Sequence, residues 1–184
     1  AEALHDIQGS LDTVLRRSEG LRRFVQNYRQ LSRLPPPQKT RIGVADYFQH
    51  LKTLVEDELA RKEIQLGFHC QPQSLVLMAD RDMLDQVAIN LIRNAANALD
   101  GTADGAIRVT ASIDDKQRTV VAVNDNGPGI PEDMVDKIFL PFFTTRHQGS
   151  GIGLALVRYI MLSHGGTVLY ERARDGGSSF RLVF

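Results

Sequence analysis

The side chains best suited to chemistry in this sequence begin with three asparagines on one expected helix. Asn90, Asn94 and Asn97 are spaced by four and three residues, so at 100° per residue they share one stripe of that helix. Asparagine is a poor helix former, and three of them cost roughly 1–2 kcal/mol relative to alanine. Amide oxygens suit a hard cation such as Mg²⁺. The stripe therefore indicates either a metal-assisted site or a solvated polar face.

A second candidate segment is Asp125-Asn-Gly127-Pro-Gly129-Ile130, which directly follows an expected strand. The glycines allow the backbone to approach a planar ligand and to adopt positive φ angles. Asp125, close to the apolar Ile130, could accept a hydrogen bond from an exocyclic amine such as that of adenine. The alternative is a surface turn, because the same residues are also strong turn formers.

The third candidate segment, glycine-rich, opens another expected helix. Backbone N–H groups at a helix N-terminus, together with the positive end of the helix dipole, favour a phosphate. The segment has neither the lysine of a P-loop nor the glycine spacing of a dinucleotide fingerprint. Its residues are Gly149-Ser150-Gly151-Ile152-Gly153-Leu154.

An aromatic loop precedes this glycine segment, running from Phe139 through two further phenylalanines to Thr144, Thr145 and Arg146. Aromatic side chains beside threonines and glycines suggest a mobile lid that folds over a bound ligand. For Phe139 an ordinary place in the core is an equal alternative.

These candidates need a scaffold of alternating helices and strands. Asp80 is a plausible N-cap for the asparagine helix over 81–99. Other helices are expected over 44–62 and 131–139 and from the glycine segment to about 164, with strands over 64–69, 75–79, 107–113, 119–123, 167–171 and 179–184. Interspersed helices and hairpins predict an α/β sandwich with a mixed sheet.

The N-terminal part has a different pattern. Over residues 4–32, apolar side chains recur every three and four positions, the spacing of a helix that packs against other helices. We expect a helix of a dimeric bundle, with a core helix of a globular domain as the alternative. Three prolines at 35–37 end the helix and form a stiff joint.

Composition narrows the function classes. Lys+Arg and Asp+Glu number 22 each, so the formal net charge is zero and no basic surface for nucleic acid or anionic lipid is indicated. One cysteine cannot form an internal disulfide. No apolar run approaches the roughly 20 residues of a membrane span. We therefore expect no nucleic-acid partner and a cytoplasmic location.

The order of the motifs over residues 38–184 resembles the ATP-binding domain of sensor histidine kinases. An asparagine helix, D-x-G-x-G, a phenylalanine-bearing lid and G-x-G-x-G correspond to the N, G1, F and G2 boxes of the GHKL ATPase superfamily. Gly177-Ser178-Ser179-Phe180 resembles that family's last box, where a small hydroxyl sits near adenine. The resemblance implies the Bergerat fold, a mixed, mostly antiparallel sheet backed by three helices.

The same resemblance assigns roles within an ATP site. Asn94 would be the Mg²⁺ ligand and Asp125 the acid that reads adenine. Asn90 and Asn97 would line the phosphate side, while the amides of residues 149–154 would hold phosphates. Arg146 stands where many relatives have a lid lysine, and either residue can pair with a phosphate.

The residue type at position 90 indicates whether the chain transfers a phosphoryl group or hydrolyses ATP. Hydrolysing members of the superfamily place a glutamate four residues before the metal asparagine, as general base for water. The neutral amide of Asn90 cannot accept a proton at pH 7. The sequence therefore favours transfer to an external nucleophile, which in a histidine kinase is a neutral imidazole.

The resemblance also implies a domain plan: residues 1–34 as the second helix of a dimerisation hairpin, 35–40 as linker and 41–184 as the catalytic domain. His5-Asp6 has the local look of an acceptor, but the unbroken pattern over 4–32 leaves no room for a hairpin turn, so the acceptor histidine is expected elsewhere. We expect the protein to form a homodimer through the N-terminal helix and to have a response regulator as partner. We also expect the chain to be the cytoplasmic portion of a sensor, with or without a membrane anchor. The alternatives are a nucleotide-binding module without chemistry and an anti-sigma-type serine kinase.

Overall fold

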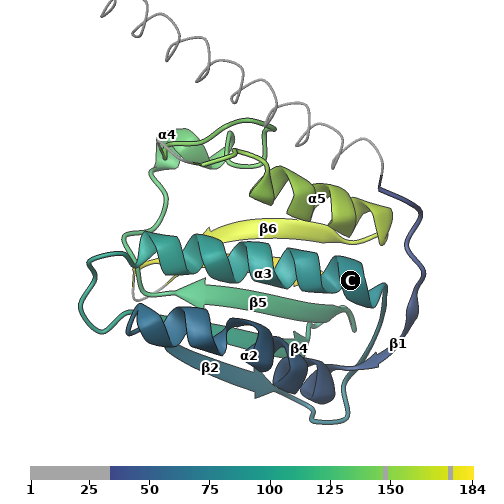
Figure 1. Cartoon of the computed structure of the whole chain (residues 1–184). Coiled ribbons are helices and arrows are strands. Elements are labelled where there is room, and N and C mark those ends of the chain that lie inside the picture. Colours follow the sequence, from purple (N-terminus) through teal and green to yellow (C-terminus); the bar gives the residue numbers. More distant parts are fainter. Residues whose placement is uncertain (1–33, 147–148, 174–175) are drawn as a thin grey trace, which may run out of the picture.

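The computed structural model describes residues 34–184, except 147–148 and 174–175. The helix expected over 4–32, His5 and most of the expected dimerisation segment lie outside the described residues. Within the described part, the expected α/β sandwich is confirmed (Figure 1). Among these residues no helix combines the length and apolar character needed to cross a bilayer.

The main layer is a five-stranded sheet in the order β2-β4-β5-β7-β6. Only β2 and β4 run parallel, and the other neighbouring strands are antiparallel, which confirms the expected mixed, mostly antiparallel sheet. The strands are β2 (Gln65–Cys70), β4 (Ala106–Ile113), β5 (Thr119–Asp125), β6 (Thr167–Arg172) and β7 (Ser178–Val183).

A second, two-stranded sheet was not expected. It pairs β1 (Thr40–Gly43) with β3 (Val76–Ala79) in antiparallel register, with Thr40 opposite Ala79. Thr40 falls in the segment expected to be linker. Four residues are too few to show an alternating strand pattern, so only the pairing partner reveals β1.

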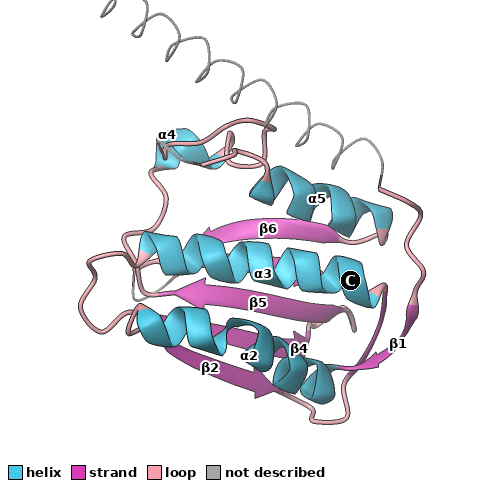
Figure 2. Cartoon of the chain, in the orientation of Figure 1, coloured by secondary structure: helices cyan, strands magenta, loops and turns pink. Residues whose placement is uncertain are grey.

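Three helices lie side by side over one face of the five-stranded sheet, as Figures 1 and 2 show. They are α2 (Val44–Arg61), α3 (Arg81–Ala98) and α5 (Gly153–Ser163). The central helix α3 packs on β5 and contacts both neighbours, while α2 packs on β2 and α5 on β6. Each helix turns an apolar stripe to the sheet, which places the core between the two layers.

The helix expected over 131–139 is shorter than predicted, because α4 spans only Glu132–Val135. Pro131 precedes the first helical residue, and bonds of the i to i+3 type, from Lys137 N–H to the Met134 carbonyl and from Leu140 N–H to the Lys137 carbonyl, replace helical bonds further on. The chain therefore continues as turns toward the loop before α5.

The N-terminus of α3 lies against the C-terminus of α5. The Asp80 carboxylate accepts a hydrogen bond from Met83 N–H at 3.2 Å, which confirms the expected N-cap. His164 is buried, with Nδ1 2.8 Å from the Ile160 carbonyl oxygen, and Nε2 accepts from Asp80 N–H at 3.0 Å. Because one imidazole joins both helix ends, α3 and α5 are fixed relative to each other here.

The segment before β1 is bonded to the same helix ends. The Gln38 N–H donates to Asp80 Oδ2 at 2.8 Å, and Lys39 Nζ donates to the His164 carbonyl oxygen at 2.8 Å. We call Gln38, Lys39, Asp80 and His164 the closed end of the α3–α5 pair. At the opposite end of the contact between these two helices lie Asn90, Asn94 and the start of α5.

Candidate functional site

A cavity of about 770 Å³ opens between α3, the segment after β5 and the start of α5. This volume lies within the range of roughly 300–1,000 Å³ that small-molecule sites have. The expected residues that line it are Asn90, Asn94, Asn97, Asp125, Gly129, Ile130, Thr144, Thr145, Arg146, Gly149, Ser150, Gly151, Ile152, Gly153, Leu154 and Ser178. Three segments distant in the sequence therefore share one cavity.

The asparagines of α3 meet the first residue of α5. A Cβ atom placed on Gly153 would lie 2.9 Å from Asn90 Oδ1, so only glycine leaves the Asn90 amide its present position, while the Asn94 amide would be in ordinary contact at 3.9 Å. Asn90 Nδ2 donates to the Gln86 carbonyl at 2.8 Å, which fixes its amide and directs Oδ1 toward α5. Polar side chains and a helix N-terminus thus face each other across the cavity.

Asp125 lies at the end of β5, buried with 6% of its surface exposed. Its Oδ1 accepts hydrogen bonds from the Gly127 N–H at 2.9 Å and the Ser178 N–H at 3.2 Å. Burial raises the pKa of this carboxyl above its ordinary value, although the two N–H donors act in the opposite direction. The carboxyl group is therefore held in one orientation at the cavity wall.

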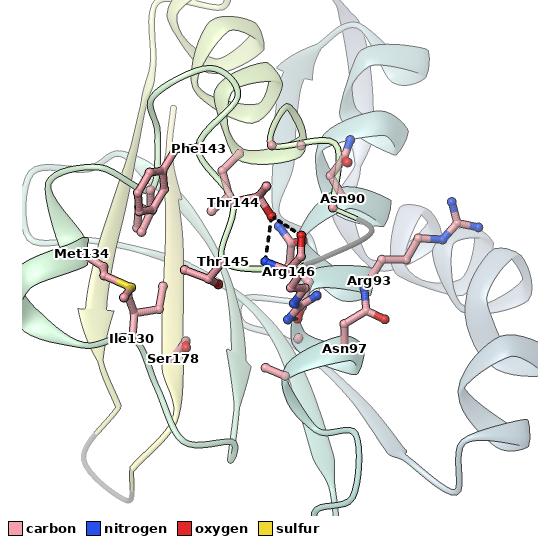
Figure 3. A pocket seen from close by; sticks show the side chains of 18 of the residues that line it. Asn90, Arg93, Asn97, Ile130, Met134, Phe143, Thr144, Thr145, Arg146 and Ser178 are labelled. Atoms are coloured by element: carbon pink, nitrogen blue, oxygen red, sulfur yellow. Dashed lines mark hydrogen bonds between the residues drawn. The ribbon is translucent and has the colours of Figure 1, made fainter. Parts of the chain in front are cut away.

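Apolar side chains surround this carboxyl. Figure 3 shows Ile130 and Met134 close to Ser178, and Ile138, Phe143 and Phe180 also line the cavity. The Ile130 N–H donates to the Tyr170 hydroxyl at 3.0 Å, which fastens the loop after β5 to the edge strand β6. One side of the cavity is thus apolar with a single buried acid, which suits a flat heterocycle with an amine.

The opposite side is polar. Arg146 Nη2 donates to the Asn94 backbone carbonyl at 3.4 Å, so the loop before α5 reaches across to α3. Asn97 also lines the cavity, but its amide oxygen accepts a hydrogen bond from Lys62 Nζ at 3.2 Å. Thr144 Oγ1 accepts from the Arg146 N–H at 3.1 Å, drawn as a dashed line in Figure 3.

Two expected site residues do not line the cavity. Gly127 lies behind Asp125, where an added Cβ would be 3.0 Å from Asp125 Oδ1. Phe139 packs edge-on against Phe180, with ring centroids 6.4 Å apart, and so belongs to the core beneath the wall. Of the phenylalanines in the loop expected to form a lid, Phe143 lines the cavity, alongside Phe180 of β7.

Sequence reasoning missed several lining residues, among them Arg93, Met134 and Ile138. Met134 and Ile138 are four residues apart after Pro131, a spacing that could have indicated an apolar face. Arg93 directly precedes Asn94, and a cation next to an expected phosphate site was a usable signal.

Asn94 is the residue that fits Mg²⁺. Within the described residues its side-chain amide has no hydrogen-bond partner and lies at the cavity wall. The described residues contain no group of three or more His, Cys, Asp or Glu that could enclose a metal ion. Mg²⁺ often takes one or two protein oxygens and completes its shell with water and substrate phosphates, and a single amide oxygen meets that requirement.

Comparison with known proteins agrees with this geometry. Residues 79–184 match the family model "Histidine kinase-, DNA gyrase B-, and HSP90-like ATPase". The sensory histidine kinase/phosphatase NtrB of Rhizobium meliloti (strain 1021) is 38% identical over 168 residues, covering 84% of this chain and 42% of NtrB. Sensor histidine kinase ZraS of Escherichia coli (strain K12) is 40% identical over 133 residues, 72% of this chain and 28% of ZraS. The chain spans less than half the length of these curated relatives.

Solved structures give the same result. A nucleotide-free form of the catalytic domain of histidine kinase ThkA has a TM-score of 0.72 and 33% sequence identity, covering 80% of this chain and 95% of that domain. ThkA in complex with response regulator protein TrrA has a TM-score of 0.70 at 30% identity, covering 94% of this chain and 48% of the solved one. This chain therefore belongs to the histidine kinase-, DNA gyrase B- and HSP90-like ATPase family, in its sensor histidine kinase branch.

Proposed function

We propose that the cavity binds ATP with Mg²⁺ and that the chain transfers the γ-phosphoryl group to the imidazole of an acceptor histidine. The observation that carries this proposal is the convergence of Asn90, Asn94, Asp125 and residues 149–154 on one cavity. A base-reading acid, a metal ligand and a phosphate-binding helix start are the parts that nucleotide binding needs.

The base would occupy the apolar side. Two backbone donors hold Oδ1 of Asp125, and the fixed carboxyl can accept a hydrogen bond from the exocyclic amine of adenine. Ile130 and Phe143 would contact the faces of the ring system. Guanine, which carries a carbonyl where adenine carries the amine, would place two acceptors against each other, so the arrangement favours adenine.

The phosphates would extend toward Asn94 and α5. The first N–H groups of α5 have no partner within the helix, and the residues that carry them line this side of the cavity. Arg146 adds a guanidinium that can pair with a phosphate. Mg²⁺ held by Asn94 would neutralise phosphate charge, and the remaining contribution of the chain is positioning.

Transfer rather than hydrolysis follows from Asn90. Its amide cannot act as a base for water at neutral pH, whereas an imidazole needs no base to be nucleophilic. We propose a response regulator as the recipient of the phosphoryl group, because ThkA forms a complex with one. We further propose that the chain dimerises through residues 1–34 and that residues 35–40 form a linker. Its proposed location is the cytoplasmic portion of a sensor.

Isothermal titration of ATP into the chain, with Mg²⁺ and with a chelator, tests the binding step. We expect saturable heat that weakens strongly when Mg²⁺ is removed. Absence of heat at ATP concentrations up to about 1 mM would contradict the proposal.

The transfer step needs an acceptor supplied in trans. A purified dimerisation domain of a sensor kinase is mixed with the chain and γ-labelled ATP, and we expect acid-labile label on its histidine. An unlabelled acceptor would indicate a binding module without chemistry. Acid-stable label on serine would indicate a serine kinase.

A further inference from the structure

Arg93 lines the polar side of the cavity, one residue before Asn94 on α3. In Figure 3 its side chain lies beside Asn97 and extends away from Thr144, Thr145 and Arg146. The side chain is 59% exposed, so little packing holds it in this position. An exposed guanidinium at the edge of a cavity can change partners without disturbing the core.

The present partner of Arg93 comes from another helix. Arg93 Nε donates to Glu58 Oε2 on α2 at 3.0 Å, and Glu58 is not among the described residues that line the cavity. This bond uses one of the five N–H groups of the guanidinium. Exposed ion pairs contribute little to stability, because water and salt screen them. The carboxylate outside the cavity therefore holds Arg93 only weakly.

The polar side has little free positive charge. Among the described lining residues the only cations are Arg93 and Arg146, and Asp100 lines the same cavity. The nearby Lys62 is engaged, since its Nζ donates to Asp100 Oδ1 at 2.9 Å. A triphosphate carries more negative charge than one Mg²⁺ neutralises, and arginine binds phosphate oxygens more strongly than it binds an exposed carboxylate.

We infer that Arg93 is a second cationic contact for the β- and γ-phosphates and that Glu58 competes with the nucleotide for it. This inference rests on the proposed function, because it takes the ligand to be ATP. In the free chain Arg93 pairs with Glu58, and in the nucleotide complex it leaves that carboxylate and turns to the phosphates.

Two substitutions separate this role from a purely structural one. If the pair only fastens α2 to α3, Arg93→Gln and Glu58→Gln remove the same bond and act in the same direction. If Glu58 competes with phosphate, the two substitutions act in opposite directions on ATP affinity. Arg181→Gln is the matched control, because Arg181 Nη1 pairs with Glu171 Oε1 at 2.8 Å and neither residue lines the cavity within the described chain.

The experiment measures dissociation constants of Mg²⁺-ATP, ADP and AMP for the unsubstituted chain and the three variants by calorimetry. Thermal unfolding of each variant shows that it is folded. We expect Arg93→Gln to weaken ATP binding about tenfold and AMP binding far less. We expect Glu58→Gln to strengthen ATP binding about threefold and Arg181→Gln to change nothing.

Equal or same-direction effects of Arg93→Gln and Glu58→Gln would overturn the inference and leave the proposed function standing. An effect on AMP as large as that on ATP would overturn it as well, because AMP lacks the phosphates in question. Failure of the unsubstituted chain to bind ATP would overturn both.

Discussion

The two ends of the α3–α5 pair differ in how completely their polar groups are paired. At the closed end His164 accepts from the Asp80 N–H, and the Gln38 N–H and the Lys39 side chain each donate a further hydrogen bond. At the other end the Asn94 side chain has no partner within the described residues, and the first residues of α5 line a cavity with no side chain capping the helix. The polar groups of these two helices are thus paired within the protein at one end, whereas some of those at the other end have no protein partner.

This difference separates stability from binding. Groups at the closed end have exchanged water for protein partners, so their loss should lower the free energy of unfolding. Groups at the cavity end keep hydrogen-bonding capacity for a ligand, so their loss should lower nucleotide affinity and leave stability almost unchanged. Four substitutions test that separation.

His164→Ala should have the largest effect on stability. It deletes a buried ring that lies edge-on to Phe184 and leaves the Asp80 N–H without its acceptor. We expect the free energy of unfolding to fall by about 3 kcal/mol, measured by urea denaturation. His69→Ala, at an exposed position of β2, is the control and should change it by less than about 0.5 kcal/mol. An ATP affinity that fell as steeply as stability would break the comparison.

Asn94→Ala should give the opposite result. ATP affinity in the presence of Mg²⁺ is expected to fall about 100-fold, because the metal loses its protein ligand. The free energy of unfolding should stay constant or rise by up to about 0.7 kcal/mol, since alanine is the better helix former. Calorimetry measures the ATP affinity and urea denaturation the free energy of unfolding on the same sample. A large loss of stability would contradict the claim that the Asn94 side chain has no partner in the folded protein.

Asp125→Asn should weaken ATP binding about tenfold, because an amide replaces the charged acceptor. Burial raises the pKa of Asp125, so the ionised group costs stability once the pH rises through its folded pKa. At pH 7 the variant should therefore unfold at the same or a higher temperature than the unsubstituted chain. Below the ordinary aspartate value of about 3.9 the two should converge, and a variant less stable at pH 7 would contradict this assignment.

Asp80→Ala should have the smallest effect, about 1 kcal/mol of stability at pH 7 for a lost N-cap. Burial acts to raise the pKa of Asp80, but the N–H groups of Gln38, Met83 and Asp82, together with the neighbouring His164, outweigh it and hold the pKa below its ordinary value. Its contribution is therefore present above about pH 3.9 and is lost as the pH falls through the folded pKa. Denaturation curves at several pH values check this, and a difference that did not shrink in acid would refute it.

The sequence predicted those parts of the fold that local pattern determines. The Asp80 cap, the asparagine stripe of α3 and the strand before Asp125 each depend on residues close together in the chain. The residues that line the cavity could be predicted individually from their order and spacing in the chain, and the expectation that they meet came from the family's order of motifs.

The parts that sequence reasoning missed depend on partners distant in the chain. β1 forms because Thr40 pairs with Ala79, and Asn97 turns to Lys62 because α2 lies beside α3. Phe139 rather than Phe143 was expected at the cavity, since neighbouring phenylalanines cannot be separated into core and wall before the sheet is known. A role for Arg93 in binding could be inferred only after the structure had shown both its bond to Glu58 and its place in the cavity wall.

The most direct test of the account is a crystal structure of this chain with Mg²⁺ and a non-hydrolysable ATP analogue. We expect the adenine amine within hydrogen-bond distance of the Asp125 carboxylate, Mg²⁺ on the Asn94 amide oxygen and phosphate oxygens on the N–H groups at the start of α5. A nucleotide bound elsewhere, or bound with its phosphates at Asp125, would contradict it.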